Sequence, residues 1–234
     1  MALPKLNSAP KYEIVVPSTG KKVRYRPYLV KEEKILMIAM ESQDQKQALS
    51  AIVDTIQSCV QEDIDGKALT TFDVEYLFTQ IRSKSVGETA KLNLKCEHCE
   101  ETTEVAVKLD DIQVQQESVD NNIQLTDDIS LKMRWPTYLE VMETSTNEND
   151  NVDMTFSLIK QCIDSVLTNE EAIRLKDEPK EEVDAFLESL SSSQFDKIRQ
   201  YVEKMPKMEH QVSFTCSHCE KGNDITLSGI SDFF

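Results

Sequence analysis

The chain has 234 residues, of which 42 are acidic and 26 are basic, and its net charge is −16. This length can bury a substantial core, and only five glycines and seven prolines interrupt it, so disorder and long flexible linkers are not expected. The acidic charge disfavours nucleic-acid binding, and no apolar run approaches the roughly 20 residues that span a membrane. Residues 1–12 lack the apolar core of a secretory signal, so we expect synthesis in the cytoplasm.

The first third of the chain predicts a hairpin followed by helices. Residues 12–16 and 22–25 flank the turn sequence Pro-Ser-Thr-Gly and predict two paired strands. A charged amphipathic helix is expected over residues 31–42, and the capping pair Thr70 and Asp73 starts a later helix that ends at Gly87. The apolar stripes of the second and third helices are Leu49, Ile52, Val53, Ile56 and Val60, and Val74, Leu77, Phe78 and Ile81.

Two Cys-x-x-Cys motifs dominate the sequence, at residues 96–99 and 216–219. Alternating apolar and polar residues precede and follow each motif, so both are predicted to be hairpin tips. The two hairpins match at an offset of 120 residues. The first hairpin contains Leu92, Leu94, Cys96, His98, Cys99, Val105 and Val107, and adding 120 to each number gives the matching residues of the second hairpin, Val212, Phe214, Cys216, His218, Cys219, Ile225 and Leu227. The two hairpins are therefore predicted to be copies.

The region between the hairpins repeats the order of the first half. Residues 118–126 are polar and are predicted to be a bridge, and residues 129–133 alternate as a strand. A helix is expected after Trp135-Pro136, which resembles Arg26-Pro27. A second helix is expected on the stripe Ile159, Cys162, Ile163 and Val166. After the acidic residues 169–182, two more helices carry Val183, Phe186, Leu187 and Leu190, and Phe195, Ile198, Val202 and Met205.

These patterns predict an α+β fold made of two duplicated helix-plus-hairpin halves, residues 1–117 and 118–234, packed closely as one unit. Aligning Ile52 with Ile159 gives an offset of 107, whereas the hairpins give 120. The second half is thus expected to have gained thirteen residues, in the acidic stretch and the helix after it.

The paired cysteines predict a structural zinc site. Zinc prefers four soft ligands in a tetrahedron, and each half supplies two, Cys96 with Cys99 and Cys216 with Cys219. One ion would then join both halves, although two separate metals remain possible. A redox pair is disfavoured, because a redox Cys-x-x-Cys usually opens a helix. We exclude His98, His218 and His210 as ligands, and interpret Cys59 and Cys162 as small buried apolar residues.

No catalytic residues are predicted. Four cysteines would close the coordination shell of zinc, and no phosphate-binding loop, nucleophile elbow or zinc-protease motif is present, so no small-molecule substrate is expected. The basic group Lys21, Lys22, Arg24 and Arg26 is either a solvated hairpin edge or a docking ridge for an acidic protein. The terminal Phe233 and Phe234 either dock on a partner or fold back on this chain.

Five further segments precede the two hairpins: residues 72–78 and 82–88 before the first, and residues 186–190, 194–198 and Met205-Pro206 before the second. These segments resemble a family of baseplate hub and hub-assembly proteins of T-even-type contractile-tailed bacteriophages. The resemblance covers nearly the whole chain. It implies a non-catalytic component of the tail baseplate whose partners are other hub proteins. It would be located in the host cytoplasm during assembly and in the virion tail if retained.

The resemblance leaves open whether the chain is a hub subunit or a transient assembly factor. An alternative function is a zinc-ribbon regulator of nucleic acid or polymerase, which predicts salt-sensitive DNA or RNA binding. A third, an oxidoreductase, predicts an accessible thiol with a low pKa.

Overall fold

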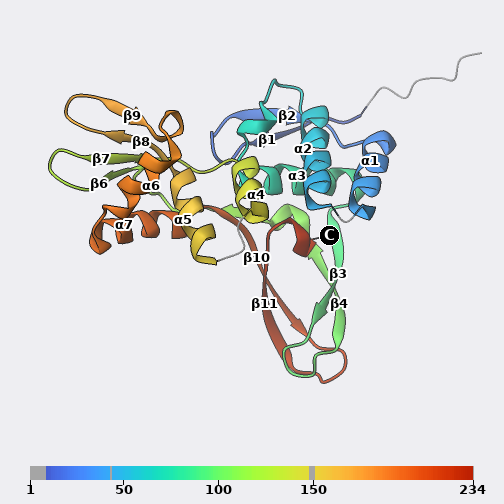
Figure 1. Cartoon of the computed structure of the whole chain (residues 1–234). Helices are drawn as coiled ribbons and strands as arrows, with labels where there is room; N and C mark the ends of the chain where they lie inside the picture. Colours follow the sequence, from blue (N-terminus) through green and yellow to red (C-terminus); the bar gives the residue numbers. More distant parts are fainter. Residues whose placement is uncertain (1–8, 43, 148–150, 234) are drawn as a thin grey trace, which may run out of the picture. The chain divides into compact units, whose positions relative to one another are not determined.

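A computed structural model describes residues 9–42, 44–147 and 151–233 (Figure 1). The fold is α+β, and the described residues form two compact units. Unit 1 contains the residues up to Gln115 together with those from Lys207 onward, and unit 2 is Gln116–Pro206. The second cysteine hairpin therefore belongs to the same unit as the first. The duplication into halves 1–117 and 118–234 concerns ancestry and stays a prediction.

The described part of unit 1 combines three α-helices with seven β-strands. Helix α2 packs against both α1 and α3. The elements are β1 (Tyr12–Val15), β2 (Lys22–Tyr25), α1 (Val30–Glu41), α2 (Gln45–Cys59), α3 (Thr71–Val86), β3 (Thr89–Lys95), β4 (Thr102–Lys108), β5 (Gln113–Gln115), β10 (Lys207–Thr215) and β11 (Gly222–Ser228). Short 3-10 helices are η1 (Gly66–Ala68), η2 (Leu109–Asp111) and η4 (Ile230–Phe233).

The buried carboxylate of Asp73 joins the first hairpin to α3. Its oxygens accept hydrogen bonds from the Thr70 backbone N–H and hydroxyl at 3.0 and 2.7 Å, which confirms the predicted capping box. The backbone N–H of Ser18, in the turn of the first hairpin, donates to the same carboxylate at 2.9 Å. One side chain therefore satisfies the open N-terminus of a helix and fixes a turn 55 residues away in sequence.

A buried ion pair holds the start of α1 against the end of α2. The guanidinium of Arg26 lies 2.8 Å from the Glu32 carboxylate and also donates to the Ser58 carbonyl. Glu32 in turn accepts from the Leu29 N–H at 2.8 Å and so caps α1. The backbone N–H of Arg26 donates to the carbonyl of Cys59, the last residue of α2, at 3.1 Å.

Two antiparallel ribbons, β3–β4 and β10–β11, lie side by side in unit 1 and extend together away from its helices (Figure 1). At the base, β5 pairs with β10 and makes a three-stranded sheet. The ribbons pack through apolar residues that alternate along the strands, as predicted. This cluster includes Ala90, Leu92, Leu94, Val107, Val212 and Leu227, with Val105, Phe214 and Ile225 at its margin.

Unit 2 contains a four-stranded antiparallel sheet in the order β6-β7-β8-β9, with four α-helices. Its core includes Leu131, Ile159, Cys162 and Ile198, and Trp135 stacks on Tyr201 with ring centroids 4.3 Å apart. The elements are β6 (Asn122–Gln124), β7 (Ser130–Met133), α4 (Tyr138–Asn147), α5 (Asn151–Cys162), β8 (Ile163–Leu167), β9 (Ala172–Arg174), η3 (Leu175–Asp177), α6 (Lys180–Glu188) and α7 (Ser192–Glu203). No helix of the described ranges is long and apolar enough to cross a membrane.

Unit 2 repeats the ion pair of unit 1 at an offset of 108 residues. Arg134 contacts Glu140 at 2.6 Å, and Glu140 accepts from the Thr137 N–H at 2.8 Å. The backbone N–H of Arg134 donates to the carbonyl of Cys162, the last residue of α5, at 2.8 Å. Each unit thus uses an arginine before its first helix to bind that helix and the end of the next.

Two element predictions were wrong. The helix expected to contain Ile163 and Val166 ends at Cys162, because those residues belong to β8 and pair with β7 in the sheet. The polar bridge at 118–126 contains strand β6, whose Ile123 pairs with Leu131. Both errors concern short strands that form by pairing with β7, which is adjacent in sequence to β6 and about 30 residues before β8.

Candidate metal centre

The tips of the two ribbons bring Cys96, Cys99, Cys216 and Cys219 together, with all four Sγ atoms within 4.8 Å of one another. Across the ribbons, the Cys96 and Cys219 sulfurs are 3.7 Å apart and the Cys99 and Cys216 sulfurs 3.6 Å apart. Four sulfurs bonded to one zinc at roughly 2.3 Å in a tetrahedron would lie about 3.8 Å apart. The spacing therefore fits a single tetrahedral ion and is far longer than a disulfide bond.

Both cysteine turns have the same backbone conformation. The Cys96 N–H donates to the Glu101 carbonyl at 2.8 Å, and the Glu100 N–H donates to the Cys96 carbonyl at 3.0 Å. In the second turn the Cys216 N–H donates to the Lys221 carbonyl at 2.9 Å, and the Glu220 N–H donates to the Cys216 carbonyl at 3.0 Å. Glu100 and Glu220 have φ angles of 63° and 60°, in the left-handed region that residues other than glycine seldom adopt. These turns point both sulfurs of each motif toward the other ribbon.

Backbone N–H groups stabilise the first thiolate of each motif. The N–H groups of Cys219 and His218 lower the pKa of Cys216 to about 6. Burial of the Cys96 thiol raises its pKa, but the N–H groups of His98 and Cys99 outweigh this, and the pKa is lowered.

The second thiol of the first motif has the opposite shift. The Glu101 N–H lowers the pKa of Cys99, yet burial and hydrogen bonds to the other three thiols raise it to about 12. Four adjacent thiolates repel one another, so a divalent cation is needed to hold all four in the charged form.

Two hydrogen bonds between the ribbons lie beside the cysteines and are also related by the offset of 120. The Glu97 N–H donates to the Asn223 side-chain oxygen at 2.9 Å, and the Ser217 N–H donates to the Thr103 hydroxyl at 3.2 Å. Adding 120 to Glu97 and Thr103 gives Ser217 and Asn223. Each ribbon thus holds the residue after the first cysteine of the other. Sequence reasoning missed Thr103 and Asn223, because the offset relates the two positions to each other but does not show that they contact the other ribbon.

The other candidate residues lie outside this cluster. His98 and His218 are exposed at the tips and His210 is half-buried in β10, and among the described residues the clustered donors are the four cysteines alone. Cys59 and Cys162 are buried, and burial raises the pKa of these thiols to about 11 and about 12, as expected of inert core residues.

The basic group of the first hairpin is partly used for internal contacts. Arg24 pairs with Glu62 at 2.9 Å, Arg26 with Glu32 at 2.8 Å, and Lys22 lies 3.9 Å from Glu13. Lys21 donates to the Asp63 carbonyl at 3.1 Å. Arg26 therefore stabilises the fold, whereas the two lysines are exposed. At the other end of the chain, η4 ends at Phe233, and Phe234 lies outside the described residues.

A family model described as "T4 bacteriophage base plate protein" matches residues 9–234 of the chain, nearly its whole length. No curated protein and no solved structure matches it significantly.

Proposed function

Because the chain belongs to the T4 bacteriophage base plate protein family, we propose that it is a non-catalytic structural or assembly component of the baseplate hub, stabilised by a structural zinc ion. The match over residues 9–234 carries the assignment, since it includes both units. The family supports a structural role in the baseplate, and the hub is the part of the baseplate that we propose.

The proposed zinc would be bound by Cys96, Cys99, Cys216 and Cys219. The four sulfurs are donors that zinc prefers, and four protein ligands leave no open position for a substrate. The ion would join two ribbons whose cysteine pairs are 117 to 123 residues apart in sequence. Its role would be to hold the ribbon tips together. The small apolar cluster between the two ribbons would do so only in part.

We also propose that the two halves arose by duplication. The supporting observations are the matching Arg–Glu pairs at an offset of 108 and the matching cysteine turns and cross-ribbon hydrogen bonds at an offset of 120. In such a duplication the two ribbons are copies that meet about an approximate twofold axis, and each copy supplies half of the metal site.

The proposed hub role predicts where the protein is found during infection. Hub assembly intermediates and finished tails would be separated on a density gradient, and this chain measured in each by quantitative mass spectrometry. We expect it in the hub intermediates, together with other baseplate proteins. Its presence in finished tails would identify a hub subunit, and its loss from them an assembly factor. Absence from both fractions, or salt-sensitive binding to DNA or RNA, would contradict the proposal.

A further inference from the structure

The outer face of helix α1 exposes large apolar side chains. Residues 35–40 are six consecutive apolar residues, yet α1 buries only Leu36 and Ala39 among them, together with Glu32. The other four residues of this run and Val30, the first residue of the helix, are between 47% and 78% exposed: Val30, Ile35, Met37, Ile38 and Met40. Residues 35–40 cover more than one helical turn, so this part of α1 is apolar on all sides, and such a segment usually has a second packing partner.

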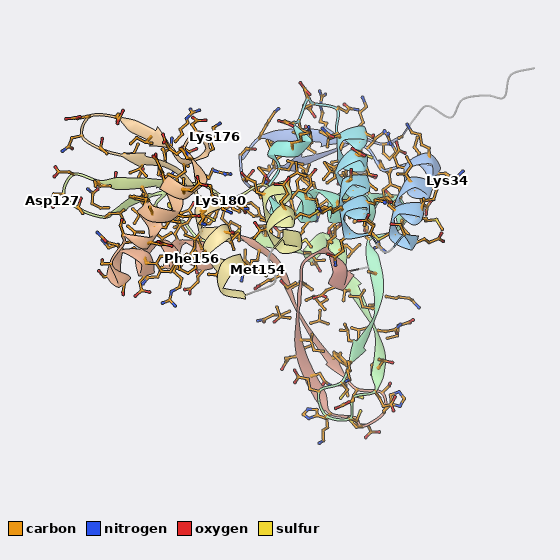
Figure 2. The ribbon with its side chains drawn as sticks, viewed as in Figure 1. Lys34, Asp127, Met154, Phe156, Lys176 and Lys180 are labelled. Atoms are coloured by element: carbon orange, nitrogen blue, oxygen red, sulfur yellow. The ribbon has the colours of Figure 1, made fainter. Side chains whose placement is uncertain are left out.

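The exposed residues follow the helical period on the side opposite the buried one. Val30, Lys34, Met37, Ile38 and Glu41 are spaced by three, four and seven residues, so they share one face. Figure 2 shows the Lys34 side chain projecting from α1 away from α2. Apolar groups therefore lie at the middle of this face, with one lysine before them and one glutamate after them.

The corresponding helix of unit 2 shows that the fold does not require this face. At the offset of 108, Ile35 corresponds to Glu143, which is exposed on α4. Met37 and Ile38 correspond in the sequence to a serine and a threonine. The apolar residues are therefore specific to α1.

The charges on this face are self-complementary. Lys34 and Glu41 lie seven residues apart on the same side of α1, and the described residues place neither of them in an ion pair. When two copies of α1 cross antiparallel about a twofold axis between Met37 and Ile38, Lys34 of each copy lies beside Glu41 of the other. Met37 and Ile38 then pack against their counterparts at the crossing point.

The geometry points to a second copy of this chain as the occupant of this face, paired antiparallel through α1. With Ile35 and Met40 at its margins, this face exposes apolar surface on the order of 500 Å² per chain, similar to the largest patches on monomeric proteins. Two such surfaces, margins included, reach about 1,000 Å², which is at the lower limit for a specific interface. We therefore expect a dimer with a Kd in the micromolar range. This inference is independent of the proposed hub function.

The test is the dissociation constant of the full-length protein by sedimentation equilibrium. Lys34→Glu places two carboxylates beside each other at both ends of the dimer interface, and Glu41→Lys places two ammonium groups there instead. Each variant alone should dimerise at least about tenfold more weakly than the wild type. An equimolar mixture of the two variants should recover dimers close to wild-type strength, because opposite charges then face each other in the mixed pair.

Two control measurements separate this interface from general effects. Val86→Glu introduces an acidic residue at an apolar position that is 60% exposed, as Met37 is, but lies on α3. This variant should dimerise normally, and Met37→Glu should be monomeric with unchanged zinc content and circular dichroism. A wild-type protein that is monomeric at about 100 μM would overturn the inference. So would dimers that both charge reversals leave intact, or capture of a different baseplate protein by α1 in a monomeric chain.

Discussion

Replacing Cys96 by serine should release the metal and destabilise unit 1 by several kcal/mol. A serine hydroxyl is a much weaker zinc ligand than a thiolate, and binding of a structural zinc contributes directly to folding free energy, by about 10 kcal/mol or more in small zinc-finger peptides. Because the apolar cluster between the ribbons remains, we expect the helices of unit 1 to stay folded and the ribbon tips to open. Amide hydrogen exchange should therefore accelerate in β3, β4, β10 and β11 and stay slow in β7 and β8.

The chain offers a matched control for this prediction. Cys59→Ala removes a buried thiol from the same unit but not from the cluster, so zinc should be retained, and only packing and the hydrogen bond from the Arg26 guanidinium to the Cys59 sulfur at 3.7 Å should be lost. Cys216→Ser should reproduce the loss of metal seen with Cys96→Ser, because both residues would bind the same ion. Loss of only half of the metal in each variant would indicate two separate ions and would contradict a single shared site.

Glu32→Gln should destabilise unit 1 by about 3 kcal/mol, because removal of one partner leaves the Arg26 charge largely buried without its counter-ion. The Glu32 side chain is 5% exposed, whereas both members of the Arg134–Glu140 pair are 33% exposed. Solvent screens the second pair, so Glu140→Gln should cost only about 1 kcal/mol. The cost of Glu32→Gln is measured by denaturation in urea, with hydrogen exchange of the α1 and α2 amides as the signal.

The single tryptophan gives an independent measurement of the cost of Glu140→Gln. Trp135 stacks on Tyr201 within unit 2, so its fluorescence reports unfolding of that unit. Glu140→Gln should shift this transition slightly, and Glu32→Gln should leave it in place. Equal costs for the two substitutions would contradict the argument from burial.

The same two carboxylates predict a loss of stability in acid. Burial raises the pKa of Glu32, but hydrogen bonds from Arg26 and Leu29 outweigh it, and the pKa in the folded protein is lowered. For Glu140 burial is likewise outweighed by Arg134 and Thr137. A lowered pKa stabilises the folded state above the unfolded value of about 4.3, and this stabilisation is lost as the pH falls through the folded pKa. Both variants should therefore show a weaker dependence of stability on pH below about 4.

The cysteine hairpins were predictable because their signals are local and occur twice. Alternating residues around two Cys-x-x-Cys motifs specify two strands and a turn, and the common offset of 120 predicts that both turns are alike. The capping pair Thr70 and Asp73 likewise marks the start of α3 within four residues. These features depend on neighbours in sequence, so the sequence alone contains them.

The remaining features depend on distant partners. Ile163 and Val166 have helical spacing, yet they form β8 because their partners in β7, 30 and 35 residues earlier, offer an edge for pairing. The contact between Glu97 and Asn223 spans 126 residues, and the pairing of β5 with β10 is similarly remote. Neither can be read from local periodicity, and the exposure of α1 becomes visible only when its buried face is known.

X-ray absorption at the zinc edge, with elemental analysis of the same sample, tests most directly whether both ribbons hold one zinc ion. We predict one zinc per chain surrounded by four sulfurs at roughly 2.3 Å. A metal-free protein with intact folding, two ions per chain, or a shell containing nitrogen or oxygen ligands would contradict it.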